Sequence, residues 1–373
     1  MRGSIRKRGS YWEYSLDLGK DPITNKRLRK SKSGFKTKKE CEKSLNELIF
    51  QVESGAYTKF EKMNLHSFLN HWLDIYSSNI ALSTKERYNQ LINNILDYEI
   101  KLKNIDDIRP FHLQELYKDM LRDNNISPNT IIKVHRLLHK AFKCAVQWQM
   151  LYVNPSAVIS PPRAIKTEMN VWDMDTCMKF LDLIKDSTLY LPYLLAITSG
   201  MRQGEIAALK WQDIDFKNEV ISVQRAFMKV NNKFILKEPK SSKSKRSIYL
   251  FDITSKVLEN HFNTQKKIKS LNKSTYNDED FVLCWENGTP YRPRYFNELF
   301  QKSIKKHEFP KIRFHDLRHS HATFLLSNNT NAKIVSERLG HSTISITLDT
   351  YSHVLPNIQK EALKDVNALI PIK

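Results

Sequence analysis

Hydrophobic and polar residues follow different patterns along the chain, and each pattern predicts a different kind of structure. In residues 1–58 aromatic and aliphatic residues alternate with polar ones, which is typical of a strand with one buried face. In residues 63–153 apolar residues recur every three or four positions, as on amphipathic helices. From residue 169 onward the helical spacing returns, interrupted by short alternating stretches. The chain is therefore predicted to be multidomain and mainly α-helical, with small β elements.

Residues 1–58 are predicted to form a three-stranded sheet closed by one helix. The segment from Thr37 to Glu40 is a capping box, which favours the start of a helix. Before it, turn residues separate the alternating strand from a returning strand that is almost wholly basic. Such a module, with basic residues on the open face of its sheet, suits a groove of duplex DNA; a merely soluble basic tail is the alternative. The candidate DNA contacts are Arg6, Lys7, Arg8, Lys26, Arg27, Arg29 and Lys30.

Residues 63–153 are predicted to form a bundle of four helices. A second capping box begins at Ser83, Pro110 begins the third helix, and Ser127 with Pro128 opens a long fourth helix. Basic residues follow this fourth helix, although basic residues on a helix usually form a solvated face. The candidate DNA contacts among them are Lys133, Arg136 and Lys140.

Residues 154–168 are predicted to be a linker, stiffened by Pro161 and Pro162. Residues 169–373 follow as the largest domain, a mixed α+β fold that is mostly helical. Alternating residues predict the strands of a small antiparallel sheet in it. These strands are expected at Glu219–Phe227, Phe234–Lys237 and Arg246–Leu250.

The composition of the chain indicates the kind of partner it binds and the cellular compartment in which we expect it. The 373 residues carry a formal net charge of +20, and +9 of it lies in the first 40 residues. An excess so concentrated favours a polyanionic partner, although charge alone does not separate DNA from RNA or from an acidic membrane. The apolar runs are too short to span a bilayer, the N-terminus shows no secretory signal, and the four cysteines form no C-x-x-C pair. We therefore expect a protein of the reducing cytoplasm.

Candidate reactive residues concentrate in short segments of the third domain. Arg202 lies between two glycines at a helix junction, which suits an anion because glycines let the backbone approach a ligand. A basic, hydroxyl-rich hairpin carries Lys240 next to the preceding strand. The segment Arg313–His321 holds three histidines, but zinc is the weaker interpretation because no cysteine is near and Arg318 would lie beside the cation. The remaining candidates are His341 and Tyr351.

Together these side chains meet the needs of phosphoryl transfer to a tyrosine. Two arginines can bind the non-bridging oxygens of a phosphate and stabilise the charge on a five-coordinate phosphorus. A phenol can attack as a covalent nucleophile, a lysine can protonate the departing 5′ oxygen, and a histidine can handle the second proton or bind the phosphate. This supply of positive charge makes a metal dispensable. A lone tyrosine in a helix is usually a core residue, and Tyr351 receives a role here because it completes the set.

The order of these residues resembles that of the tyrosine recombinases, specifically the integrases of phages and conjugative transposons. The resemblance implies a catalytic set with no metal and no nucleotide cofactor, in which no expected residue is replaced. His319 and His321 lie outside this set and are expected to be structural, while Lys243 and Lys245 share the hairpin of the lysine. The matching residues and motifs are Arg202, Lys240, His315-Asp-Leu-Arg318-His, Leu-Gly-His341 and Tyr351, the last as the nucleophile.

The resemblance also implies roles for the other parts of the chain. Residues 1–58 resemble the arm-type DNA-binding domain of such integrases, residues 63–153 their SAM-like core-binding bundle, and residues 169–373 their catalytic domain with a C-terminal tail helix, docked on its own protomer or on a neighbour. The implied partners are double-stranded DNA with core-type and arm-type sites, a homotetramer of the chain, an excisionase and a host DNA-bending protein. The implied function is integration and excision of a mobile element through a 3′-phosphotyrosine. The alternatives are a type IB topoisomerase-like strand transferase and a catalytically silent DNA-binding regulator.

Overall fold

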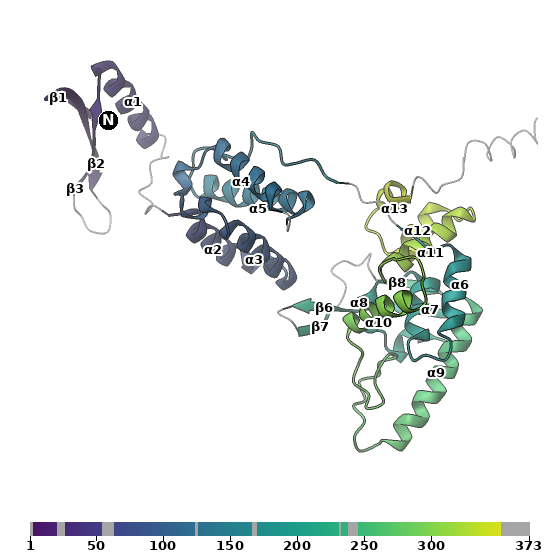
Figure 1. The fold of residues 1–373 in the computed structure, drawn as a ribbon. Helices are drawn as coiled ribbons and strands as arrows, with labels where there is room; N and C mark the ends of the chain where they lie inside the picture. The colour runs from purple at the N-terminus through teal and green to yellow at the C-terminus, as the bar shows by residue number, and fades with distance from the viewer. Residues whose placement is uncertain are drawn as a thin grey trace, which may run out of the picture. The chain divides into compact units, whose positions relative to one another are not determined.

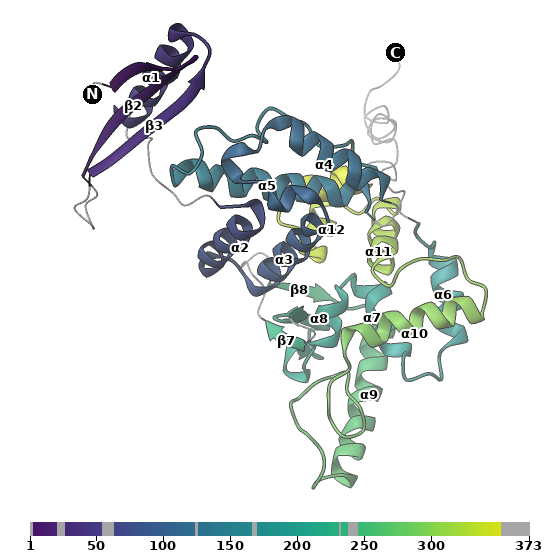
Figure 2. The same ribbon diagram turned by 60° about the vertical axis from the view of Figure 1, so that its left-hand side comes forward.

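A computed structural model describes residues 3–20, 27–53, 63–123, 126–165, 170–230, 233–237 and 245–351 (Figures 1 and 2). The chain divides into two compact units, Met1–Lys166 and Thr167–Lys373. The predictions for Lys26, for Lys240 and for the tail helix fall outside the described residues. No described helix combines the length and the apolar composition that crossing a bilayer requires.

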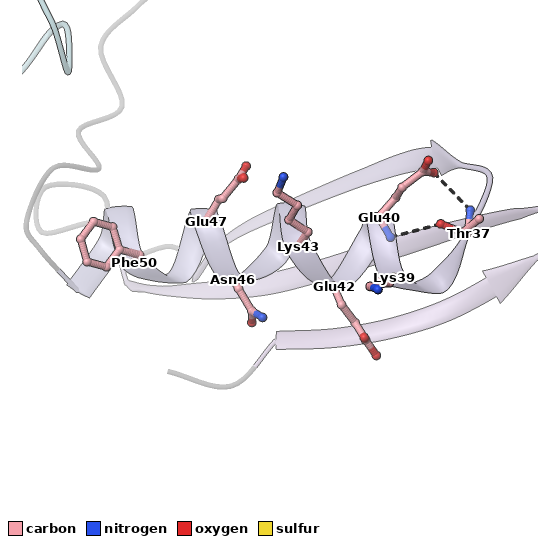
Figure 3. A pocket seen from close by; sticks show the side chains of 8 residues that line it. All are labelled: Thr37, Lys39, Glu40, Glu42, Lys43, Asn46, Glu47 and Phe50. Carbon is pink, nitrogen blue, oxygen red and sulfur yellow. Dashed lines mark hydrogen bonds between the residues drawn. The ribbon is translucent and has the colours of Figure 1, made fainter.

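The N-terminal module is the predicted three-stranded sheet with one helix. Strands β1 (Gly3–Arg8), β2 (Tyr11–Lys20) and β3 (Arg27–Phe35) pair antiparallel in that order, and α1 (Lys38–Glu53) packs on one face. Alternate residues of β2, Tyr14 and Leu16, are buried against Leu45 and its neighbours on α1. The capping box is confirmed, because the backbone N–H of Thr37 donates to Glu40 and that of Glu40 donates to the Thr37 hydroxyl (Figure 3).

The next part of the chain is the predicted helical bundle, with α2 (Leu65–Tyr76), α3 (Leu82–Leu96), α4 (Pro110–Arg122) and α5 (Pro128–Gln147) around one apolar core. Ser127 caps α5 as predicted, since its hydroxyl accepts the backbone N–H of Thr130. The capping box predicted at Ser83 is wrong. The helix already begins at Leu82 with Ala81 as its N-cap, so Ser83 lies inside the first turn.

The segment that the sequence marks as a linker is partly bound to this bundle. Ile159 is buried in the bundle core, the side-chain amide of Asn129 donates to the carbonyl of Ile165, and that of Asn154 donates to the carbonyl of His139. Residues 154–165 therefore pack against the helical bundle and are not a free linker over this length.

The C-terminal unit is mostly helical and built on an aromatic core that includes Trp172, Phe180, Tyr193, Phe300 and Phe314. In Figures 1 and 2 the long α9 extends beyond the other helices of this unit. The helices are α6 (Met174–Leu183), α7 (Tyr190–Ser199), α8 (Gln203–Ala207), α9 (Asp252–Leu271), α10 (Pro293–Lys306), α11 (Asp316–Ser327), α12 (Ala332–Leu339) and α13 (Ile344–Tyr351).

The strands of this unit form two small sheets where the sequence predicted one. Strands β4 (Ile214–Asp215), β5 (Val220–Val223) and β8 (Arg246–Tyr249) make one antiparallel sheet, and β6 (Ala226–Val230) pairs with β7 (Lys233–Lys237) in another. The single strand predicted over Glu219–Phe227 is thus wrong. Its first half pairs with β8, and its second half leaves that sheet to pair with β7, so the strand breaks at residues 224–225.

Candidate active site

Arg202 is held at the turn between α7 and α8. Gly200 ends α7 with φ +65°, a conformation that side chains rarely adopt, and a Cβ there would come within 2.6 Å of the His321 ring. Nη1 of Arg202 donates to Oε1 of Glu205 at 2.9 Å, and Nη2 donates to the carbonyl of Gly340 at 3.2 Å. The side chain is nevertheless 40% exposed, so it is oriented by the protein and still accessible to a ligand.

Arg318 lies beneath this turn, on α11, and is 3% exposed. Its Nη1 donates to the carbonyl of Gly200 and its Nη2 to that of Leu339, each at 2.7 Å, so it joins the ends of α7 and α12. Burial, followed by the charges of Arg202 and Arg246, lowers the pKa of Arg318 to about 9. The site is therefore rich in cationic charge that a bound anion would stabilise.

A buried ion pair supports Arg202. Nη2 of Arg246, at the start of β8, donates to Oε2 of Glu205 at 2.8 Å, and its Nε donates to the carbonyl of Arg338 at 2.7 Å. Burial would raise the pKa of Glu205, but the hydrogen bonds and charge of Arg246, together with Arg202, lower it to about 2. The carboxylate is therefore ionised at neutral pH and fixes Arg202 beside Arg246.

Glu205 and Arg246 were not among the residues selected from the sequence. The spacing of Arg202 and Glu205, three residues apart across a helix start, was a signal that could have identified the first. The pairing of Glu205 with Arg246 joins α8 to β8 over 41 residues, and no local pattern predicts it.

His341 and His315 flank the arginines. His341 follows α12, where Gly340 has φ +68°, and its Nδ1 lies 2.8 Å from the Thr347 hydroxyl. Burial and the charges of Arg318 and Arg202 lower the pKa of His341 to about 4, and burial followed by Arg318 also lowers the pKa of His315. Both imidazoles are therefore neutral at pH 7.

Tyr351 ends α13 and is 1% exposed, packed among apolar side chains of α11 and α12. Its Oη lies 2.6 Å from Nδ1 of His319. Burial raises the pKa of Tyr351 to about 12, although the charge of Arg318 acts in the opposite direction. His319, expected to be structural, thus contacts the candidate nucleophile, which the sequence alone did not indicate.

The structure brings together all the predicted catalytic residues that it describes. The bonds from Arg202 to Gly340 and from Arg318 to Gly200 join the two arginine segments to the segment of His341, and the charge of Arg318 acts on His315 and Tyr351. His321 is buried, with Nδ1 donating to the Ile197 carbonyl and Nε2 accepting from Arg338. Among the described residues, no group of three or more His, Cys, Asp or Glu side chains is placed to hold a metal ion.

A hollow of about 530 Å³ lies beside this set, next to His341. Its basic lining residues are Lys245 just before β8, Arg246 at the start of β8 and Lys333 on α12, and Glu337 on α12 also lines it. Two larger hollows, one on the outer side of α1 (Figure 3) and one between α7 and α9, contain none of the predicted catalytic residues. Of these three hollows, the basic one is therefore the one that contains a predicted catalytic residue, His341.

Comparisons with known proteins decide the family. A family profile described as "Phage integrase family" matches residues 171–357, half of the chain. The chain belongs to the phage integrase family. Two further profiles match the N-terminal parts of this integrase, an "Arm DNA-binding domain" at residues 4–52 and a "Phage integrase, N-terminal SAM-like domain" at residues 64–121. The chain is accordingly a site-specific tyrosine recombinase, an enzyme that cleaves and rejoins DNA.

Relatives similar to this integrase match it over nearly its whole length. A tyrosine recombinase XerC-like protein of Caldanaerobacter subterraneus is 29% identical, covering 98% of each chain. The ICEBs1 integrase of Bacillus subtilis is 26% identical, covering 98% of this chain and 100% of its own.

Solved structures share its fold. The Tn1549 transposon integrase in complex with a circular intermediate DNA superposes with a TM-score of 0.70 at 20% identity, covering 82% of this chain and 100% of that one. A lambda integrase dimer bound to a core site gives a TM-score of 0.58 at 17% identity, covering 93% of each chain.

The integrase presents several of its predicted arm contacts on the open face of the N-terminal sheet. Arg6 pairs with Glu13 in the strand register, and its Nη2 lies 3.0 Å from the nearly buried Glu13 carboxylate, while Nη1 of Arg8 lies 3.6 Å from it. Nε of Arg27 lies 2.7 Å from Asp17. Carboxylates thus hold exposed guanidinium groups in place over the sheet. The basic residues on this face are Arg6, Arg8, Arg27 and Arg29.

The register separates Lys7 and Lys30 from that face. Lys7 pairs with Trp12 and Lys30 with Leu16, and both partners belong to the side that packs on α1. The sequence prediction placed these two lysines on the same surface as Arg6. The strand register instead places them on the opposite face of the sheet.

The predicted contacts on α5 also differ from one another. Lys133 and Arg136 are exposed and one helical turn apart. Nζ of Lys140 instead lies 4.5 Å from the centre of the Tyr76 ring, a cation–π contact. Lys140 is therefore partly engaged within the bundle.

Proposed function

We propose that the integrase cuts one DNA strand at a time through attack of Tyr351 on a backbone phosphate, leaving a 3′-phosphotyrosine and a free 5′-hydroxyl. That hydroxyl then attacks the partner duplex, so that integration and excision of a mobile element proceed by successive strand exchanges. One observation carries the proposal. Hydrogen bonds to backbone carbonyls at the ends of α7 and α12 hold Arg202 and Arg318 in place, and Tyr351 is close enough to Arg318 for its positive charge to act on the phenol.

In this proposal the arginines bind the scissile phosphate. A guanidinium has five N–H donors, so Arg318, which donates to two carbonyls, retains donors for a phosphate oxygen. The partly exposed Arg202 binds a second oxygen, and the neutral His315 and His341 hydrogen-bond the same group. The two cations stabilise the charge that develops on phosphorus. Lys240 in the preceding hairpin donates the proton that the departing 5′ oxygen takes.

The remaining parts of the chain hold the DNA. We assign the arm-type sites to residues 1–58 and the core-type sites to residues 63–153 together with the catalytic domain of residues 169–373. Exposed arginines on the open sheet face support the first assignment, and Lys133 and Arg136 on α5 support the second. Strand exchange between two duplexes requires four active sites, so the functional form is a tetramer on DNA, with an excisionase and a host DNA-bending protein setting its direction.

Covalent trapping tests this function. Nicked duplexes tiling the DNA that flanks the gene are incubated with the protein in excess chelator, and the nick lets the short cleaved fragment diffuse away. A covalent protein–DNA complex that survives denaturation is expected without added metal. Specific binding to these duplexes with no covalent complex would instead support a silent regulator.

The open face of the arm sheet yields a separate prediction. Arg6→Ala should weaken binding to a DNA site selected by the full-length protein from random duplexes by about 1–3 kcal/mol, because it removes a groove contact. Lys7→Ala, the matched control, removes the same charge from the other face and should change only the salt-dependent part of binding. Fluorescence anisotropy at several salt concentrations measures both. Equal losses for the two variants would contradict the assignment of the open face to DNA.

A further inference from the structure

The contact between His319 and Tyr351 has no role in the proposed mechanism so far. His319 lies on α11 one residue after Arg318, and its ring centre is 5.8 Å from that of Tyr351. Nδ1 and Oη are 2.6 Å apart, a short hydrogen bond between a nitrogen base and the attacking oxygen. A nucleophile and a base within this distance are the arrangement that activates hydroxyl nucleophiles in enzymes.

Before the attack the proton lies on the phenolic oxygen, and the imidazole nitrogen is free to accept it. Burial raises the pKa of Tyr351 to about 12, so at neutral pH its hydroxyl keeps its proton until the attack. Burial, and then the neighbouring His315, lowers the pKa of His319 to about 4, so its imidazole is neutral. A phenol is a stronger acid than an imidazole N–H. The hydroxyl therefore donates to Nδ1, and the ring proton of His319 is on Nε2.

The two histidines of the predicted set are placed differently. Nδ1 of His341 is hydrogen-bonded to Thr347. His315 begins α11 with its ring edge-on to His319, at 5.3 Å between ring centres. The ring of His319 thus neighbours both the ring of His315 and that of the tyrosine. His341 and His315 are therefore suited to binding the phosphate, whereas His319 is suited to accepting the hydrogen bond of the phenol.

We propose that His319 accepts the proton of Tyr351 during strand cleavage, an inference that rests on Tyr351 being the nucleophile. The bond from Oη to phosphorus forms and the bond from phosphorus to O5′ breaks. The phenolic proton moves to Nδ1, and O5′ takes a proton from the general acid. In rejoining, the incoming 5′-hydroxyl gives its proton back to the general acid, and protonated His319 returns its proton to the departing phenolate.

The phosphate of the DNA lowers the free-energy cost of this transfer. Protonated His319 would be opposed by nearby positive charge, which a phosphodiester offsets because an anion close to an imidazole favours its charged form. Proton uptake is therefore coupled to DNA binding. The groups that act on His319 are His315, Asp316, Arg318 and Arg313, with His341 and Tyr351 on the neighbouring segments.

Two amide substitutions separate proton acceptance from positioning. The Asn side chain in His319→Asn, and the longer one in His319→Gln, can accept the phenolic hydrogen bond but cannot take up its proton. Single-turnover cleavage of a nicked duplex should be about 10²–10⁴-fold slower for both. The part of the wild-type decline at acidic pH that comes from protonation of His319 should be absent from both, and only the part due to groups such as His341 should remain. Anisotropy with the same duplex and a thermal unfolding curve identify a variant that fails to fold, and the other variant then provides the test.

A modified substrate shows which proton is affected. A 5′-bridging phosphorothiolate leaves as a thiolate, which needs no protonation. It should relieve the defect of Lys240→Ala, the control for the leaving group, and leave the defect of His319→Asn unchanged. Relief of His319→Asn by sulfur, wild-type rates for both amide variants, or faster cleavage by them would each overturn the proposal. A wild-type protein that forms no adduct at Tyr351 would instead refute the proposed function itself.

Discussion

Tyr351→Phe is expected to abolish covalent attachment to DNA and to leave DNA binding intact. The substitution removes only the Oη atom, and the phenyl ring still fills the apolar site between α11 and α12. The lost hydrogen bond to His319 costs about 0.5–1.5 kcal/mol of the free energy of unfolding, too little to unfold the domain. Trapping with a nicked duplex, followed by denaturing electrophoresis, should show no adduct.

Tyr193→Phe is the matched control for this variant. Tyr193 is also fully buried in the catalytic domain, and its hydroxyl donates to the carbonyl of Phe296 at 3.1 Å. The control loses a comparable hydrogen bond and no nucleophile, so it should form the adduct at nearly the wild-type level. A similar loss of adduct in both variants would mean that buried hydroxyls matter here only for stability.

Arg318→Lys is expected to slow cleavage by about 10²–10³-fold, the usual loss when one donor to a developing anion is removed. A lysine keeps the charge, but its compact ammonium group lacks the wide planar fork of five N–H donors that a guanidinium presents. It therefore cannot bind the carbonyls of Gly200 and Leu339 and a phosphate oxygen together. Single-turnover cleavage with saturating protein measures the chemical step apart from binding.

Arg338→Lys provides the comparison. Arg338 is also an arginine that joins α12 to neighbouring segments, with its nitrogens donating to His321, to the Tyr249 carbonyl and to the Thr198 carbonyl. We expect it to lower thermal stability about as much as Arg318→Lys, with a much smaller effect on cleavage. Equal effects of the two variants on cleavage would show that Arg318 acts through packing alone.

Local signals in the sequence predicted much of this fold because their causes are local. Thr37 and Ser127 cap helices through side chains three residues from the N–H groups that they accept, so a short motif contains the whole interaction. At Ser83 the same kind of motif failed, because the chain already turns into a helix at Leu82. The break between β5 and β6 depends on which strand each half pairs with, and periodicity does not contain that information.

The candidate site also has a part that the sequence predicts and a part that only the folded structure shows. The order of Arg202, His315, Arg318, His341 and Tyr351 was readable because the residue types themselves carry the chemistry. The residues that hold these side chains in place could not be identified from the sequence. Glu205 meets Arg246, and Tyr351 meets His319, only when α8, β8, α11 and α13 pack together.

The most direct test of the central claim is to identify the amino acid that becomes linked to DNA. The trapped wild-type complex is digested with nuclease and trypsin, and the modified peptide is sequenced by tandem mass spectrometry. The tryptic peptide covering residues 339–360 contains a single tyrosine, Tyr351, and is expected to carry the nucleotide on that residue. Attachment at any other residue, or the absence of a covalent link on every duplex tested, would contradict the account.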